Sequence, residues 1–280
     1  MTQTWNDLRL DLAAALAEFL DPLEARAEAA RWFKEGLGKE PAWMAAHGTE
    51  GVPDEARRKI SGWVRRRKKG EPWAYILGWA SFAGRRFAVR PGVLIPRPET
   101  ELTLELALVT GHALGVTRAC DIGTGSGILA VSLALRTKWQ IAAVDVSAEA
   151  LAVAKANAEA LGAPVAFLPG DLLEPLADPL ELVVANLPYV DPADAPSLQK
   201  ELRYEPSLAL FAEDRGLALS TRLLEQARRR NALGCVLEIG AGQGAELSER
   251  AFAAGWARAE VTRDLAGHDR VLVVQGQGGG

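Results

Sequence analysis

Segments typical of strands and of helices alternate along the chain from residue 118 onward, and no other feature constrains the fold as strongly. Short apolar runs are separated by longer stretches whose apolar residues recur with helical spacing. Parallel strands need long crossover connections, which helices supply, so the alternation predicts a largely parallel sheet with helices on both faces. The predicted strands are 118–122, 141–146, 165–169, 180–185, 235–239, 259–263 and 270–275.

The last two predicted strands are joined by the short segment 264–269, which leaves no room for a helix. They are therefore expected to pair as an antiparallel hairpin at or near one edge of the sheet. The predicted fold class is α/β, with a Rossmann-like sheet of seven strands in which the last pair is antiparallel.

Helical patterns dominate the N-terminal part of the chain. A first helix is indicated by apolar residues at helical spacing, and a second is predicted after Pro53. Glycines and short β-rich runs between Tyr75 and Ile95 then predict a hairpin, and two prolines stop it before a helix that begins near Glu99. The predicted domains are a helical domain that docks the substrate (1–75), a β-hairpin linker (76–95) and the sheet domain (96–280). The apolar residues of the first helix are Leu8, Leu12, Leu16 and Phe19.

Composition narrows the classes of protein. No apolar run approaches the roughly 18 residues that a membrane span needs, and the N-terminus carries acids instead of a basic, signal-like start. We therefore expect a cytoplasmic monomer without membrane association. The cysteines form no C-x-x-C pair and the histidines have no partner at ligand spacing, so neither a disulfide nor a metal site is predicted. These residues are Cys120, Cys235, His47, His112 and His268.

Charge is distributed unevenly. Residues 57–97, here called the basic segment, hold twelve Lys or Arg against one acid, Glu71, so the rest of a chain with net charge −4 carries −15. Such a segment favours a docking surface for an anionic partner, either nucleic acid or an acidic protein. A solvated helix face is the alternative interpretation, especially for 65–69.

A glycine-rich turn and two carboxylates predict a nucleoside pocket. Glycines at positions 123, 125 and 127 follow the first strand and open a helix, where backbone N–H groups are free to meet a ligand. Asp145 ends the next strand, 20 residues after Gly125, where a carboxylate can hold ribose hydroxyls. Asp171 follows the third strand, in a position to accept from an adenine amino group.

The spacing of these glycines favours S-adenosylmethionine over a dinucleotide. A dinucleotide fingerprint has a third glycine where this chain has Ile128, so hydride transfer is disfavoured. A second glycine motif from Gly240 to Gly244, followed by Asp264, imitates the first. Because 36 residues follow Gly244, too few to complete a nucleoside-binding sheet, we interpret it as the turn after the fifth strand.

The segment Asn186-Leu187-Pro188-Tyr189 can grip a flat NH₂ group. Asn186 Oδ1 and the Leu187 carbonyl would accept the two N–H bonds while Tyr189 covers the plane. The same residue types also form ordinary turns after a strand. With a nucleoside pocket on neighbouring strands, the NH₂ grip becomes the preferred interpretation.

The ordered motifs closely resemble those of the peptide chain release factor N5-glutamine methyltransferases over about residues 70–275. They are Tyr75-Ile-Leu-Gly78, Phe82-x-Gly84, Phe87-x-Val89, Leu94-Ile-Pro-Arg-Pro-Glu-Thr-Glu101, Asp121-Ile-Gly-Thr-Gly-Ser-Gly127, Asn186-x-Pro-Tyr189, Leu237-Glu-Ile-Gly240 and Asp264-Leu-Ala-Gly-His-Asp-Arg270. The resemblance implies methyl transfer from S-adenosylmethionine to the glutamine amide of the Gly-Gly-Gln motif of release factors, without a requirement for nucleic acid.

The resemblance also implies roles for single residues. Leu187 stands where that family has a second-position proline, and Asn-Leu-Pro-Tyr is also common in enzymes resembling ribosomal RNA adenine dimethyltransferases. The implied catalytic and substrate-binding residues are Asn186, Leu187, Pro188 and Tyr189, with Arg97 also binding substrate. The implied cofactor-binding residues are Asp121, Gly123, Thr124, Gly125, Ser126, Gly127, Asp145, Asp171, Leu172 and Asn186.

Two other functions fit parts of the pattern. A nucleic acid adenine-N6 methyltransferase needs the same NH₂ grip and could use the basic segment to follow phosphates. A regulator that binds the cofactor without catalysis would have little use for the grip. The segment 94–101 and the overall acidity favour the glutamine methyltransferase.

Overall fold

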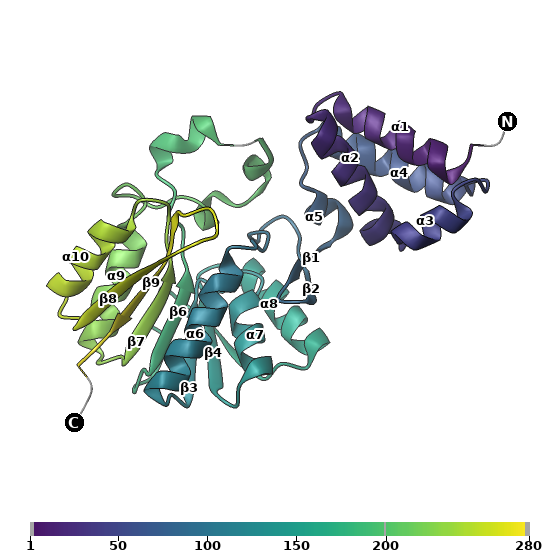
Figure 1. Cartoon of the computed structure of the whole chain (residues 1–280). Helices are drawn as coiled ribbons and strands as arrows, with labels where there is room; N and C mark the ends of the chain where they lie inside the picture. Colours follow the sequence, from purple (N-terminus) through teal and green to yellow (C-terminus); the bar gives the residue numbers. More distant parts are fainter. Residues whose placement is uncertain (1–2, 199, 278–280) are drawn as a thin grey trace. The chain divides into compact units, whose positions relative to one another are not determined.

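The computed structural model describes residues 3–198 and 200–277 (Figure 1). Contacts divide the chain into a helical unit that ends at Gly78 and a sheet unit that begins at Trp79. None of the helices in the described residues is long and apolar enough to cross a membrane.

The helical unit contains the helices predicted for its sequence. A capping box at Thr4 begins the first one, and its buried face carries Leu8, Leu12 and Leu16. Phe19, predicted on the same face, lies beyond the end of this helix and is 38% exposed. The elements are α1 (Trp5–Ala17), α2 (Pro22–Arg31), the π-helical turn η1 (Trp32–Gly36), α3 (Pro41–His47), α4 (Asp54–Lys68) and α5 (Trp73–Leu77).

The core of the helical unit is built on tryptophans. Trp32 stacks on Trp73 with ring centroids 4.5 Å apart and meets Trp63 edge to face at 5.9 Å. A buried ion pair joins Arg67 Nε to Glu28 Oε1 at 2.8 Å and ties α4 to α2. These aromatic and ionic contacts fix α4 within its unit.

The hairpin is shorter than the sequence predicts. Residues 75–77 complete α5, which ends where Gly78 adopts a left-handed φ of +87°. The antiparallel strands β1 (Trp79–Phe82) and β2 (Arg85–Ala88) follow, and residues 89–95 are not strand. The prediction of β structure at both ends of this stretch was wrong, because its first residues belong to α5 and its last residues form an irregular segment.

All seven predicted strands of the sheet are present, and their order is β5-β4-β3-β6-β7-β9-β8. The first five run parallel, whereas β9 pairs antiparallel with both β7 and β8, which confirms the predicted end hairpin. The strands are β3 (Arg118–Ile122), β4 (Gln140–Asp145), β5 (Val165–Pro169), β6 (Leu182–Asn186), β7 (Gly234–Glu238), β8 (Arg258–Arg263) and β9 (Asp269–Gln275).

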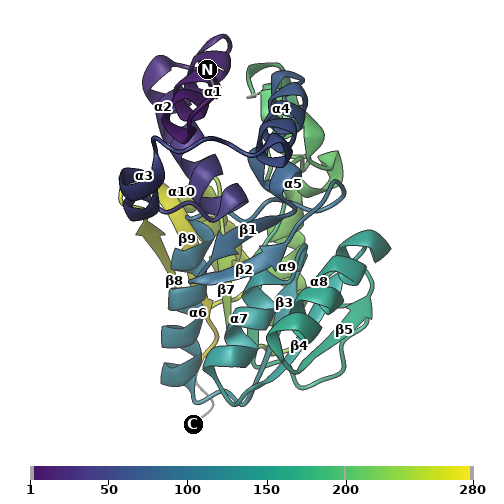
Figure 2. The ribbon, with the colours of Figure 1, turned by 90° about the vertical axis from the view of Figure 1, so that its right-hand side faces the viewer.

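Helices cover both faces of the sheet (Figures 1 and 2). One face packs against α6 (Thr100–Leu114), α7 (Ile128–Arg136) and α8 (Ala148–Leu161), and the hairpin phenylalanines Phe82 and Phe87 join this core. The other face packs against α9 (Ala218–Arg229) and α10 (Gly244–Ala253). Between β6 and α9 the chain forms short 3₁₀ turns, η2 (Pro192–Ser197), η3 (Lys200–Tyr204) and η4 (Ser207–Ala209).

The strand order reverses at β3, which has β4 on one side and β6 on the other. The connection after β3 therefore packs on one face of the sheet, and the connection after β6 packs on the other. A crevice at such a point is where open α/β sheets bind their ligands.

Candidate active site

The glycine turn after β3 has the backbone that its sequence requires. Gly123, Gly125 and Gly127 adopt φ values of +70°, +56° and +84°, a region that side chains disfavour. Asp121 holds the turn from below, because its Oδ2 accepts from Thr124 Oγ1 at 2.6 Å and from the Ala130 N–H at 3.1 Å. Burial raises the pKa of Asp121 to about 6.

Neighbouring side chains approach this turn closely. A Cβ at Gly123 would lie 2.9 Å from Leu187 Cδ2, and one at Gly127 would lie 3.0 Å from the Ala154 Cβ. Asn157 of α8 donates to the Ser126 carbonyl at 2.9 Å and also bonds both backbone groups of Ala88. The turn is therefore packed on both sides.

A cavity of about 390 Å³ opens at the carboxyl ends of β3, β4, β5 and β6, a size that suits a small-molecule ligand. Four of the predicted cofactor-binding residues do not line it within the described part of the chain, and all four are buried: Asp121, Thr124, Ser126 and Gly127. The predicted site residues that line it are Gly123, Gly125, Asp145, Asp171, Leu172, Asn186, Leu187 and Pro188.

Asp145 presents its carboxylate from the end of β4. Its Oδ2 accepts from the Gly125 N–H at 2.9 Å and its Oδ1 from the Ser147 N–H at 2.8 Å. Burial raises the pKa of this carboxyl, against those backbone bonds. The side chain is thus fixed between the first turn and the start of α8.

Asp171 and Leu172 follow β5 and also line the cavity. Asp171 Oδ2 forms an ion pair with Arg222 of α9, a partner that the sequence did not predict. Leu172 is 5% exposed and holds a left-handed φ of +49°. Its side chain gives the cavity an apolar surface.

Asn186 ends β6 at the edge of the cavity. Its Nδ2 donates to Thr100 Oγ1, the first residue of α6, at 3.1 Å. Within residues 3–198 and 200–277, no group donates a hydrogen bond to its Oδ1. Leu187, the next residue, is buried against Gly123.

Tyr189 and Arg97 do not line the cavity within the described ranges. Burial raises the pKa of Tyr189 to about 12, so its phenol stays neutral. Arg97 forms an ion pair with Glu205 at 2.5 Å, and the same carboxylate accepts from the Ile95 N–H at 2.9 Å. Arg97 thereby joins the segment before α6 to the segment before η4.

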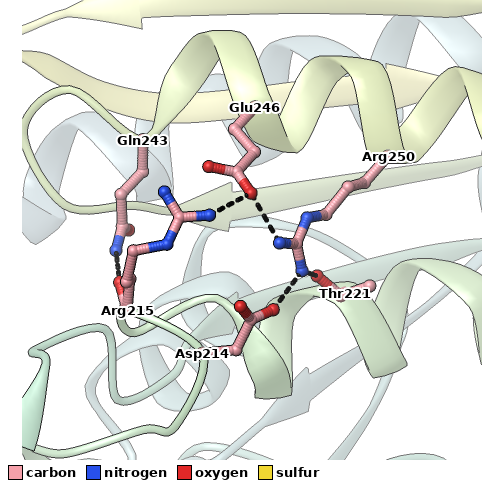
Figure 3. A network of polar contacts seen from close by, with 6 residues as sticks. All are labelled: Asp214, Arg215, Thr221, Gln243, Glu246 and Arg250. Carbon is pink, nitrogen blue, oxygen red and sulfur yellow. Dashed lines mark hydrogen bonds and ion pairs between the residues drawn. The ribbon is translucent and has the colours of Figure 1, made fainter.

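Sequence reasoning missed a role for the second glycine motif. Gln243 Oε1 accepts from the Gly240 N–H at 2.8 Å, while its Nε2 donates to the carbonyls of Tyr189 at 3.0 Å and Arg215 at 3.1 Å. Figure 3 shows Gln243 beside a network in which Glu246 joins Arg215 to Arg250. The turn after β7 therefore holds the backbone of the predicted NH₂ grip.

Metal-binding clusters are not found in the part of the chain that the structure describes, where no three His, Cys, Asp or Glu residues gather suitably. Cys120 and Cys235 are both buried and unbridged.

Comparison with known proteins decides the family. Models of two domains match the chain, "PrmC N-terminal domain" at residues 11–78 and "Methyltransferase small domain" at residues 106–210. The release factor glutamine methyltransferase of Bordetella pertussis is 41% identical over 90% of this chain and 95% of its own length. The chain belongs to the release factor glutamine methyltransferase family. The member from Bacillus subtilis is 37% identical over 84% of this chain and 86% of its own length.

Solved structures share the methyltransferase fold at low sequence identity. The hMettl16 catalytic domain, solved in complex with an RNA hairpin, superposes with a TM-score of 0.57 at 17% identity over 81% of this chain and 83% of that one. A methyltransferase from Pyrococcus furiosus gives a TM-score of 0.51 at 15% identity, over 80% of this chain and 98% of that one.

Proposed function

We propose that this enzyme transfers the methyl group of S-adenosylmethionine to the side-chain amide nitrogen of the glutamine in the Gly-Gly-Gln motif of peptide chain release factors. The place of Asn186 carries the proposal, because its Oδ1 accepts no hydrogen bond from a described residue and it lines the cavity. The names of the curated relatives support the choice of acceptor.

The cavity walls fit S-adenosylmethionine. At one end of the cavity, Gly123 and Gly125 expose their backbone. A side chain at position 123 would collide with Leu187, and one at position 125 would be strained by the positive φ. Asp145 would hold the ribose hydroxyls, and Leu172 would lie against the adenine. When bound, S-adenosylmethionine supplies an electrophilic methyl group.

The acceptor amide needs orientation, because its nitrogen lone pair is delocalised into the carbonyl. Asn186 Oδ1 and the Leu187 carbonyl would accept its two N–H bonds, aim the nitrogen at the cavity and favour the positive charge that develops there. No side chain is needed as a general base, since the methylated nitrogen is acidic enough to lose its proton to water.

Leu187 is compatible with this role although the family resemblance implies a proline at this position. A proline restricts the backbone by its ring, whereas the side chain of Leu187 is 5% exposed and packs against Gly123. Burial thus restrains the carbonyl that would face the substrate.

We propose further that the helical unit docks the release factor through α4. The structure narrows the choice of docking residues within the basic segment, because three of them form ion pairs inside the unit. Arg66 pairs with Glu71, Arg67 with the buried Glu28 and Lys68 with Glu18. Arg58 and Arg65 are exposed on the same helix, beside the groove at Trp63. They are the residues of α4 best suited to meet an acidic surface.

Reversal of both charges, in the Arg58→Glu/Arg65→Glu variant, should weaken methylation of whole release factor and spare a short Gly-Gly-Gln peptide. Arg26→Glu, an exposed arginine of α2, is the matched control and should leave both substrates unaffected. Equal losses on factor and peptide would refute docking through α4.

The function itself is tested by transfer of a labelled methyl group to recombinant release factor, to its Gly-Gly-Ala variant and to RNA in parallel. Label on the factor alone supports the proposal. Label on RNA with none on the factor would replace it with the adenine-N6 alternative.

A further inference from the structure

Behind Asn186 lies a buried polar chain. Thr100 is 0% exposed, and its Oγ1 accepts from Asn186 Nδ2 at 3.1 Å. Glu238 is 1% exposed at the end of β7, directly paired with Asn186 in the sheet register. Thr103 Oγ1 donates to Glu238 Oε2 at 3.2 Å, and a hydrogen bond from Thr100 also lowers the pKa of Glu238.

The direction of these hydrogen bonds follows from the number of protons. When Glu238 is ionised it can only accept, so the single hydroxyl proton of Thr100 is then directed to it. The lone pairs of Thr100 then face Asn186, which must turn its NH₂ toward them. Asn186 Oδ1 is consequently left to point at the cavity, as an acceptor for the substrate amide.

The opposite direction would disable the grip. If Thr100 donated to Asn186 instead, Oδ1 would be engaged and the Asn186 NH₂ would face the NH₂ of the substrate, donor against donor. A buried donor without an acceptor is destabilising, so the orientation of this amide matters for turnover.

We propose that Thr100 and Glu238 are positioning residues that fix the Asn186 amide with Oδ1 toward the acceptor nitrogen. This inference rests on the proposed function and extends it to two residues that touch neither substrate nor cofactor. Neither residue lines the cavity in the described part of the chain.

Charged and titratable groups around Glu238 set the pH range in which its carboxylate can orient the Thr100 hydroxyl. Burial raises its pKa, Arg270 of β9 lowers it, and Glu99 before α6 raises it. Tyr189 faces Glu238 as a neutral phenol. Once protonated, Glu238 can donate to Thr100 and reverse the chain, so kcat should fall as pH falls through the raised pKa.

The experiment compares isosteric variants at saturating S-adenosylmethionine. Thr100→Val and Glu238→Gln should lower kcat on release factor roughly tenfold to hundredfold, because the valine cannot hold the amide and the glutamine can donate. Thr100→Ser should restore most of the activity. Glu238→Gln should also lack the acidic limb of the wild-type kcat profile.

Thr103→Val is the matched control, because Thr103 bonds the same carboxylate without touching Asn186. It should affect thermal unfolding about as much as Thr100→Val while largely keeping kcat. Calorimetric binding of S-adenosylmethionine should be unchanged in every variant.

Equal kcat losses in Thr100→Val and Thr103→Val, or no rescue by Thr100→Ser, would refute the positioning role of Thr100 and Glu238. A wild-type enzyme that fails to methylate the factor would instead refute the proposed function. The two failures are thereby distinguished.

Discussion

The turns after β3 and β7 have similar sequences, Asp121-Ile-Gly123 and Glu238-Ile-Gly240, but differ in what they hold. Asp121 bonds its own turn through Thr124, whereas Glu238, one methylene longer, reaches Thr103 on α6. Each carboxylate keeps one oxygen without a hydrogen-bond partner among the described residues. Similar local sequences therefore support the wall of the cavity after β3 and the buried polar chain behind Asn186 after β7.

Neighbouring strands explain the difference. The turn after β3 lies between parallel strands and opens on the cavity. At the turn after β7, a Cβ on Gly244 would lie 2.9 Å from Val261 of β8 and 2.7 Å from Asp269 of β9. The antiparallel hairpin fills the space that a second pocket would need, so a glycine pattern predicts a ligand site only where the adjacent strands leave room.

The largest expected effect is at Asn186, whose strand lies between the two turns. Asn186→Ala removes the acceptor that the second turn positions, so kcat should fall roughly hundredfold or more. Binding of S-adenosylmethionine, which depends on the first turn, should persist in calorimetry. Near-normal turnover would show that Asn186 is an ordinary turn residue.

The carboxylates downstream of the two turns should behave oppositely. Asp145→Ala should raise the dissociation constant for S-adenosylmethionine at least about tenfold, since it removes a charge-assisted hydrogen-bond acceptor from the cavity. Asp264→Ala, the matched change after the second turn, removes the partner of Arg270 and should lower thermal stability without altering binding. Equal effects of the two substitutions on binding of S-adenosylmethionine would contradict the conclusion that only the turn after β3 forms the cofactor site.

Much of this arrangement follows from sequence, and the rest depends on distant contacts. The seven strands were predictable because apolar runs and helical spacing are local signals. The partners of Asn186 and of Arg97 lie 86 and 108 residues away, so no local pattern reveals them. For the same reason, the pairing of Arg66, Arg67 and Lys68 was not apparent from a run of like charges.

Gln243→Leu should produce an intermediate effect. The change leaves the carbonyls of Tyr189 and Arg215 without their donor and loosens the grip from the second turn. We expect a five- to tenfold lower kcat, about 1 kcal/mol, with binding of S-adenosylmethionine intact. A change confined to cofactor binding would place Gln243 with the first turn instead.

The smallest effect is a pH dependence of stability from Asp121. Its pKa is about 6 in the folded chain, above the unfolded value, so between about pH 4 and 6 the folded state holds the extra proton. The free energy of unfolding should therefore fall by about 1 kcal/mol as pH rises from about 4.5 to 5.5. Chemical denaturation should show this slope in the wild type and a reduced one in Asp121→Asn; equal slopes would contradict it.

The central claim is that the Asn186–Tyr189 segment presents a glutamine amide to the methyl donor. Mass spectrometry of release factor treated with enzyme and S-adenosylmethionine tests it most directly, by locating the added methyl group within the Gly-Gly-Gln peptide. The account predicts one methyl on the side-chain nitrogen of that glutamine, lost in the Asn186→Ala enzyme. A methyl on another residue, or on RNA and not on the factor, would contradict it.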